Sequence, residues 1–135
     1  MRTALFALVL AAALSVGCHG NPASPSGQLP LTTTLHVGQE VSVSGLSATF
    51  VAVTGDSRCP LNAFCVWAGE AALQFELSAN HRAARYDLKV GASNPNPPPT
   101  THEGFAIEVQ SLQPYPSGSR SIPQEDYRAT VKISR

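Results

Sequence analysis

The 135-residue sequence has few charged residues and no excess of either sign. Lysine and arginine number nine, aspartate and glutamate number nine, and charged residues make up 13% of the chain, about half of the usual quarter. A protein that binds nucleic acid needs a basic field to neutralise phosphates. The balance of charge therefore excludes nucleic acid as an expected partner.

The sequence also lacks recognisable catalytic and cofactor motifs. It contains no Gly-x-Ser-x-Gly nucleophile turn, no glycine-rich phosphate loop and no His-Glu-x-x-His metal motif. His36, His81 and His102 share no ligand spacing, and we expect each of them to lie on the surface. We therefore expect neither an enzyme nor a bound metal or cofactor, although β folds can assemble sites from distant residues.

No stretch approaches the twenty apolar residues that a transmembrane helix requires. The longest apolar run, Ala4–Leu14, has eleven residues and as a helix would span about 16 Å. It follows a single positive charge at Arg2, which is the pattern of a secretory signal peptide. We therefore predict export, with residues 1–17 as the signal.

The cysteines are few and odd in number, so the three of them cannot all pair within one chain. Gly17-Cys18 after the apolar run resembles the lipobox of bacterial lipoproteins, although Ser15 stands where that pattern has leucine. The resemblance implies that Cys18 is acylated and anchors the chain to the cell envelope, at the outer membrane where the host has two. The alternative is an ordinary signal cleaved after Ala11-Ala12-Ala13, which leaves Cys18 as a free thiol.

We expect a tether and one domain after Cys18. Residues 18–30 form the tether, because His19 to Pro30 contains three prolines, two glycines and no acidic or basic residue. Residues 31–135 suffice for a single domain with a modest core.

Apolar and polar residues alternate with a period of two in this domain, and helical periodicity is missing. About seven short strands are expected, at Thr33–Val37, Glu40–Ser44, Ala48–Thr54, Leu73–Leu77, Tyr86–Val90, Phe105–Val109 and Tyr127–Ile133. The pattern predicts an all-β, antiparallel two-sheet sandwich of immunoglobulin-like architecture, with a small barrel as the alternative. Two proline-containing segments, 91–104 and 114–124, are interpreted as edge connections rather than as dedicated binding loops.

Cys59 and Cys65 are separated by five residues. In an exported chain a disulfide is the natural interpretation. Two thiols without further ligands at suitable spacing cannot complete a zinc site, and a reactive redox pair has only two intervening residues. The sequence therefore predicts a structural disulfide, which would stabilise the fold by about 2 kcal/mol.

The residues around this pair form a signature. Asp56-Ser57-Arg58-Cys59-Pro60 is followed, after four residues, by Cys65-Val66-Trp67-Ala68-Gly69-Glu70. The arrangement resembles a signature of short, uncharacterised bacterial envelope lipoproteins, and the similarity extends more loosely to the final strand. It implies an exported all-β protein and carries over no activity.

Two interpretations of the signature segment stay open. We expect Asp56 to cap backbone N–H groups, Arg58 to pair with Asp56 or Glu70, and Trp67 to pack against the disulfide and one end of a sheet. In the first interpretation the segment is a rigid plug over the core. In the second, Asp56, Arg58, Trp67 and Glu70 belong to an interaction surface, where tryptophan and arginine are favoured contact residues.

The sequence thus predicts a non-catalytic, lipid-anchored cell-envelope protein. Its domain is expected to bind or organise something near the membrane, with an envelope protein as the expected partner. The alternatives are a small protease inhibitor built on a β-sandwich and a carrier of a small ligand or metal.

Overall fold

The computed structural model describes residues 27–92, 97–118 and 120–135. The predicted signal peptide, the predicted lipidation site Cys18 and most of the predicted tether lie outside the described residues. The expected domain lies within them, apart from residues 93–96 and 119.

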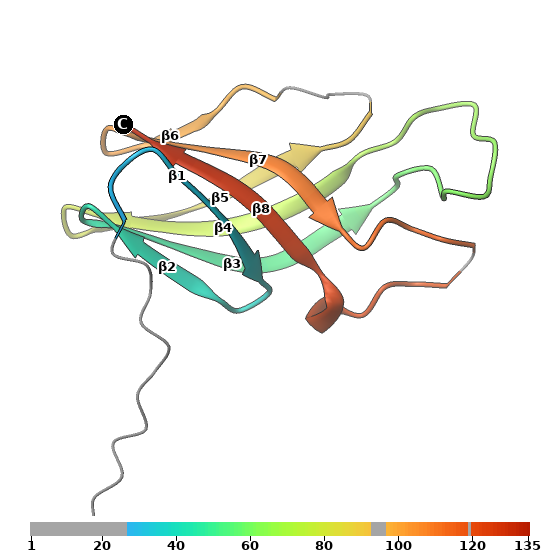
Figure 1. Ribbon diagram of the computed structural model, residues 1–135, viewed down its shortest axis with the longest axis horizontal. Helices are drawn as coiled ribbons and strands as arrows, with labels where there is room; N and C mark the ends of the chain where they lie inside the picture. Colours follow the sequence, from blue (N-terminus) through green and yellow to red (C-terminus); the bar gives the residue numbers. More distant parts are fainter. Residues whose placement is uncertain (1–26, 93–96, 119) are drawn as a thin grey trace, which may run out of the picture.

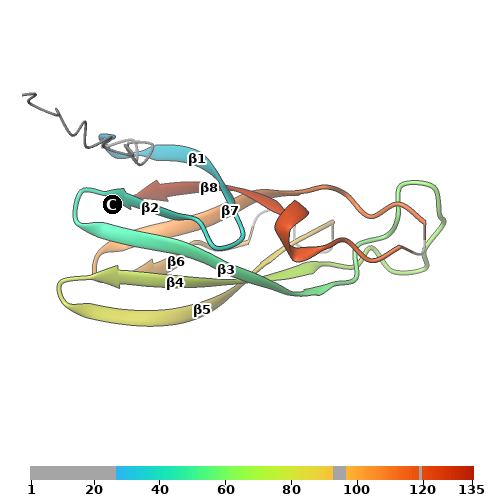
Figure 2. The same cartoon turned by 90° about the horizontal axis from the view of Figure 1, so that it is seen from below.

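Eight strands form two four-stranded antiparallel sheets (Figure 1). One sheet has the order β1-β8-β7-β6 and the other β2-β3-β4-β5, and Figure 2 shows the two as stacked layers. The strands are β1 (Leu31–His36), β2 (Glu40–Val43), β3 (Leu46–Asp56), β4 (Ala71–Ala79), β5 (Arg82–Val90), β6 (Thr100–His102), β7 (Phe105–Gln113) and β8 (Arg128–Ser134). A short 3-10 turn, η1 (Gln124–Asp126), precedes β8.

The predicted antiparallel two-sheet sandwich is confirmed, and the sheets do not close into a barrel. Strands that follow one another along the chain are neighbours within each sheet, and β1 adds to the far side of β8. The connectivity is therefore a meander, in contrast to the Greek key of immunoglobulin domains. Alternation along a strand identifies its buried face but says nothing about its neighbour, which is why the strand order could not be predicted.

The core lies between the sheets and is built by the inward-facing residues of each strand. β4 alternates strictly, with every odd position from Ala71 to Ala79 buried. Phe75 pairs with Phe50 of β3 and their rings stack at a centroid distance of 5.0 Å. A fragment of residues 27–135 contains both sheets and every core residue that the structure describes.

The prediction of a surface position was confirmed for His36 and His81 but is wrong for His102. Residues 100–102 form the short strand β6 inside the segment expected to be a connection, and pairing with β7 turns His102 inward. Its Nε2 donates to the Arg82 carbonyl at 3.1 Å, and its Nδ1 lies 3.0 Å from the Tyr86 hydroxyl. A three-residue strand is too short to produce a period-two signal.

The two ends of the sandwich carry different connections. The β2–β3, β4–β5 and β6–β7 hairpins lie at the end from which residue 27 emerges (Figure 1). The long β3–β4 and β7–β8 connections extend from the opposite end. The segment that carries the cysteine signature therefore projects away from the start of the described chain.

Candidate functional site: an apolar disulfide loop

The β3–β4 connection, residues 57–70, is called the disulfide loop here. Its neck is closed by Ser57, whose backbone N–H and hydroxyl both donate to the Glu70 carbonyl at 2.9 Å. The Glu70 N–H donates back to the Ser57 hydroxyl at 3.2 Å. Gly69 has φ +62°, and a Cβ atom there would lie 1.8 Å from the Ser57 carbonyl oxygen. Only glycine fits at this position of the neck.

The predicted disulfide between Cys59 and Cys65 is confirmed, with the two Cα atoms 5.8 Å apart. Within the closed ring the Ala63 N–H donates to the Pro60 carbonyl at 3.1 Å and forms a turn. The disulfide therefore encloses a short segment that already has a defined turn.

Arg58 is buried beneath the loop, with 4% of its surface exposed. Its Nε donates to Asp56 Oδ1 at 2.8 Å and its Nη2 to Asp56 Oδ2 at 2.6 Å. The guanidinium also donates to the carbonyls of Leu112 (2.6 Å) and Pro114 (3.0 Å), which belong to the end of β7 and the connection after it. Arg58 thus fastens the loop to the other sheet, and the predicted pairing with Asp56 is confirmed.

The aromatic ring of Tyr115 covers the Arg58 guanidinium, whose Cζ lies 4.7 Å from the ring centroid. The disulfide loop and the β7–β8 connection are also joined at two further points. The Leu61 N–H donates to the Pro116 carbonyl at 3.0 Å, and the Gly118 N–H donates to Asn62 Oδ1 at 3.1 Å. Two adjacent connections therefore support each other.

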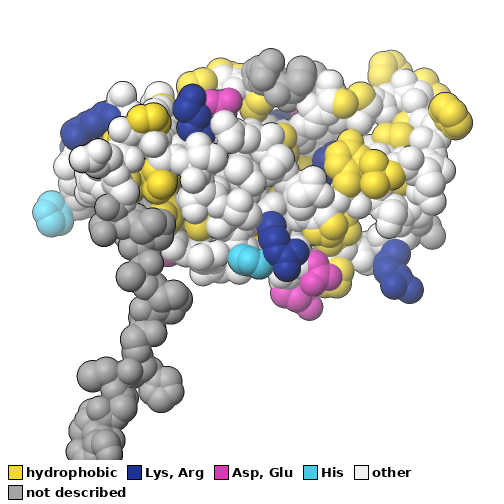
Figure 3. Space-filling model, viewed as in Figure 1, with side chains coloured by type: hydrophobic (Ala, Val, Ile, Leu, Met, Phe, Trp, Pro, Cys, Tyr) yellow, Lys and Arg dark blue, Asp and Glu magenta, His cyan; other side chains and the backbone are white. Residues whose placement is uncertain are grey.

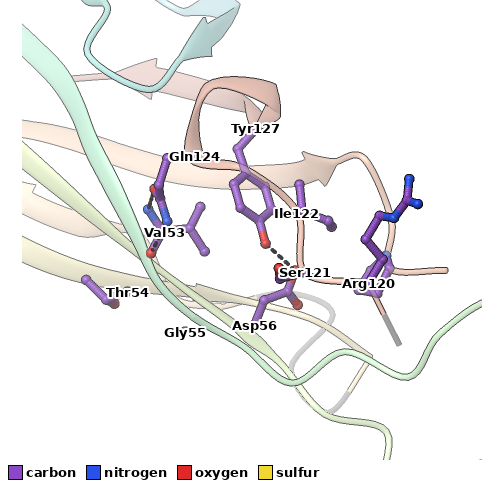
Figure 4. A pocket seen from close by; sticks show the side chains of 10 residues that line it. Val53, Thr54, Gly55, Asp56, Arg120, Ser121, Ile122, Gln124 and Tyr127 are labelled. Atoms are coloured by element: carbon purple, nitrogen blue, oxygen red, sulfur yellow. Dashed lines mark hydrogen bonds between the residues drawn. The ribbon is translucent and has the colours of Figure 1, made fainter. Parts of the chain in front are cut away.

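Asp56 lies at the end of β3 and accepts hydrogen bonds from three groups. Besides the guanidinium, the Arg58 N–H donates to Oδ1 at 3.2 Å, which confirms the expected capping role. The Tyr127 hydroxyl donates to Oδ2 at 3.0 Å, as Figure 4 shows. Burial by itself raises the pKa of Asp56, but the hydrogen bonds and positive charge of Arg58 outweigh it and hold this pKa below its ordinary value.

Tyr127 lies directly before β8, and the pKa of its hydroxyl is changed by burial and by the neighbouring Asp56. Burial raises its pKa to about 12, and the negative charge of Asp56 adds to the effect. Beside Tyr127 the side chain of Gln124 pairs with the β3 backbone, donating to the Val53 carbonyl and accepting from the Val53 N–H, both at 2.9 Å. These side chains line an open pocket of about 260 Å³ (Figure 4).

Glu70 makes a separate ion pair at the neck. Its Oε1 lies 2.5 Å from Lys89 Nζ on β5. The hydrogen bond and the negative charge of Glu70 raise the pKa of Lys89 above its ordinary value. Arg58 was expected to pair with Asp56 or Glu70, and of these two it pairs with Asp56.

The tip of the disulfide loop carries four large apolar side chains that are exposed. Leu61, Phe64, Val66 and Trp67 each expose at least 75% of their surface. We call these four residues the apolar tip. No charged residue occurs from Cys59 to Gly69, and Figure 3 shows hydrophobic side chains gathered at this end of the molecule.

The expectation that Trp67 packs against the disulfide and a sheet end is wrong, because the residue is 83% exposed. The contacts beneath the loop are made instead by Arg58, with the Leu112 carbonyl and the Tyr115 ring. The four residues of the predicted interaction surface are also divided. Asp56 and Arg58 lie underneath, Glu70 lies partly exposed at the neck, and of the four only Trp67 is largely exposed.

Sequence reasoning missed Leu61, Phe64 and Val66 as members of the exposed surface. The available signal was the uncharged stretch from Cys59 to Gly69, which contains four large apolar residues and no period-two alternation. Apolar residues in such a stretch have no strand face on which to be buried.

In the parts of the chain that the structure describes, no three His, Cys, Asp or Glu side chains are grouped so that they could hold a metal ion. Within the same residues, no helix has the length and apolar character needed to cross a membrane.

Fold and site together define a two-sheet β-sandwich that carries a braced apolar loop at one end. Comparison with protein-family models, with curated proteins and with solved structures found no match to this chain.

Proposed function

We propose that the chain is a non-catalytic, lipid-anchored protein of the cell envelope whose β-sandwich serves as a binding module. Acylated Cys18 provides the anchor, and the apolar tip makes the contact. The observation that carries the proposal is the exposure of Leu61, Phe64, Val66 and Trp67 on a loop held by a disulfide and a buried arginine.

Large apolar side chains that stay exposed as a group mark interaction sites. The rings of Phe64 and Trp67 alone present roughly 300–400 Å². At about 25 cal/mol per Å², their burial corresponds to about 8–10 kcal/mol of gross hydrophobic free energy. This is comparable with the cost of association, about 4–15 kcal/mol. The tip alone therefore supports a weak contact, and a membrane anchor that raises the local concentration makes it effective.

The rigidity of the loop supports a binding role over an accidental exposure. Free loops with apolar residues lose conformational entropy when they bind. Here the disulfide, the hydrogen bonds of Arg58 and the bond from Leu61 to Pro116 fix the backbone beforehand. The contact therefore requires little ordering.

The position of the tip also fits an N-terminal anchor. Residue 27 lies at the end of the sandwich opposite the disulfide loop (Figure 1). An anchor at Cys18 leaves nine further residues to reach residue 27, at most about 30 Å of extended chain. The tip is left free to meet a partner.

A second candidate, a protease inhibitor, is favoured by one observation: a disulfide-braced loop projects from one end of a β-sandwich with Phe64 fully exposed. Incubation of the 27–135 fragment with serine, cysteine and metalloproteases tests it. Stoichiometric inhibition that a Phe64→Ser substitution abolishes would support this candidate over the first.

The main proposal is tested in the full chain expressed in a bacterial host. Cys18→Ala should abolish incorporation of labelled fatty acid and release the protein from the membrane fraction, whereas Cys59→Ala should keep both. Continued membrane association of Cys18→Ala would contradict the anchor. A photoreactive residue in place of Trp67 should form adducts in cells, whereas one in place of the exposed Thr101 should not.

A further inference from the structure

We infer that the apolar tip inserts into the interfacial region of a phospholipid bilayer. The inference rests on the proposed function, in which the tip is the contact surface, and it names the partner of that surface. The domain then makes a second membrane contact besides its N-terminal anchor.

The composition of the tip fits the membrane interface. Tryptophan and aromatic side chains concentrate at the level of the lipid headgroups, and leucine and valine favour the acyl region below. The loop has no charged residue from Cys59 to Gly69, so entry into the interface desolvates no charge there.

Part of the backbone of the disulfide loop is hydrogen-bonded within the molecule. Unpaired N–H and C=O groups are costly in lipid. The Leu61 N–H is bonded to the Pro116 carbonyl, the Ala63 N–H is bonded to the Pro60 carbonyl, and Pro60 has no N–H. The Asn62 side chain accepts from the Gly118 N–H. The turn from Pro60 to Ala63 therefore meets part of its hydrogen-bonding need within the molecule.

The shape of the tip favours a lipid surface over a protein partner. All four side chains expose three quarters or more of their surface, so they project from the loop. A protein partner would need a matching cavity for each projecting side chain, and contact residues of protein interfaces are enclosed by a rim that excludes water. Lipids rearrange around a projecting group.

Two cations lie on segments that adjoin the disulfide loop. Lys89 is about half exposed beside the neck, and the exposed Arg120 lies on the adjoining β7–β8 connection (Figure 4). Arg120 can meet a lipid phosphate when the tip is inserted, whereas Lys89 is already paired with Glu70. Because tip and residue 27 occupy opposite ends (Figure 1), two membrane contacts hold the domain lengthwise along one membrane or between two.

Trp67 is the only tryptophan in the chain, so its fluorescence reports directly on the tip. The 27–135 fragment is mixed with vesicles of phosphatidylcholine and phosphatidylglycerol. We expect a blue shift of the Trp67 emission and quenching by bromine placed on the upper acyl chain. Phe64→Ser and Leu61→Ser should each lower the partition constant about tenfold, whereas Ala83→Ser, on the exposed part of β5, should leave it unchanged.

Three results would overturn the inference. An emission of Trp67 that is unshifted with vesicles would exclude insertion. If a photoreactive residue at position 67 then formed adducts with a protein in cells, the proposed function would stand with a protein as the partner. A concentration-dependent shift without vesicles would mean that the tip pairs with a second copy. Binding that survives Phe64→Ser and disappears in high salt would assign the contact to the basic residues.

Discussion

Arg58 and Asp56 form a buried bidentate ion pair, with Nε 2.8 Å from Oδ1 and Nη2 2.6 Å from Oδ2, at the point where β3 leaves the sandwich. The remaining bonds of the guanidinium go to the backbone of the other sheet and its connection. The pair therefore lies beneath the disulfide loop and fastens it to the other sheet, and both side chains are largely buried.

Replacement of Arg58 by leucine should lower the free energy of unfolding of the 27–135 fragment by about 3–5 kcal/mol. The substitution removes the guanidinium from the Asp56 carboxylate and from the carbonyls of Leu112 and Pro114, and it leaves a largely buried carboxylate without its counter-ion. Arg85→Leu is the matched control, since Arg85 pairs with Glu76 at 2.9 Å on the exposed face, and its loss should cost less than about 1 kcal/mol. Urea unfolding measures both, and equal losses would show that Arg58 does not hold the loop.

The Tyr127 hydroxyl makes the stability of the domain sensitive to alkali. Its folded pKa of about 12 exceeds the ordinary value of 10.0, so the folded state favours the protonated phenol. The stabilisation is fully present below pH 10 and is lost as the pH rises towards 12, in total on the order of 2 kcal/mol.

A Tyr127→Phe variant should lose this dependence while keeping the ring in the core. Thermal midpoints of the native fragment and of the Tyr127→Phe fragment, measured from about pH 9 to about pH 12, should converge as the pH rises. Parallel curves over this interval would contradict the assigned role of the hydroxyl.

Alternation along the strands predicted most of the sandwich, because a strand with one buried face has apolar and polar residues in alternation. Phe75 and Leu77 follow the rule and are fully buried. The disulfide loop shows no such alternation, because the positions of its side chains are set by the neck, the disulfide and Arg58 rather than by a sheet face. The pairing of Cys59 with Cys65 was predictable from their spacing together with the expected export, but the exposure of Trp67 depends on where the loop leaves the sheets. That position follows from the register of β3 and β4, which a single sequence does not reveal.

Gly69→Ala should weaken the neck by roughly 3 kcal/mol. A left-handed residue with a side chain costs about 1–2 kcal/mol, and the added Cβ would lie 1.8 Å from the Ser57 carbonyl oxygen, so the backbone must move. Gly38→Ala is the control, because Gly38 also has a positive φ but nothing lies within 4 Å of its added Cβ. Chemical unfolding should show a clearly larger loss for Gly69→Ala, and similar losses would exclude the steric conflict at the neck.

Cys59→Ser should lower the thermal midpoint of the 27–135 fragment, because opening the ring to Cys65 releases chain entropy worth about 2 kcal/mol in the unfolded state. The sandwich should still fold, since Arg58 continues to fasten the loop to Leu112 and Pro114. The double variant Cys59→Ser/Cys65→Ser should match the single one, because either change removes the same bond. Calorimetry without reductant measures all three proteins. An unchanged midpoint in Cys59→Ser would mean that the disulfide does not stabilise the domain, and a further fall in the double variant would assign the effect to the packing of the thiols rather than to the bond.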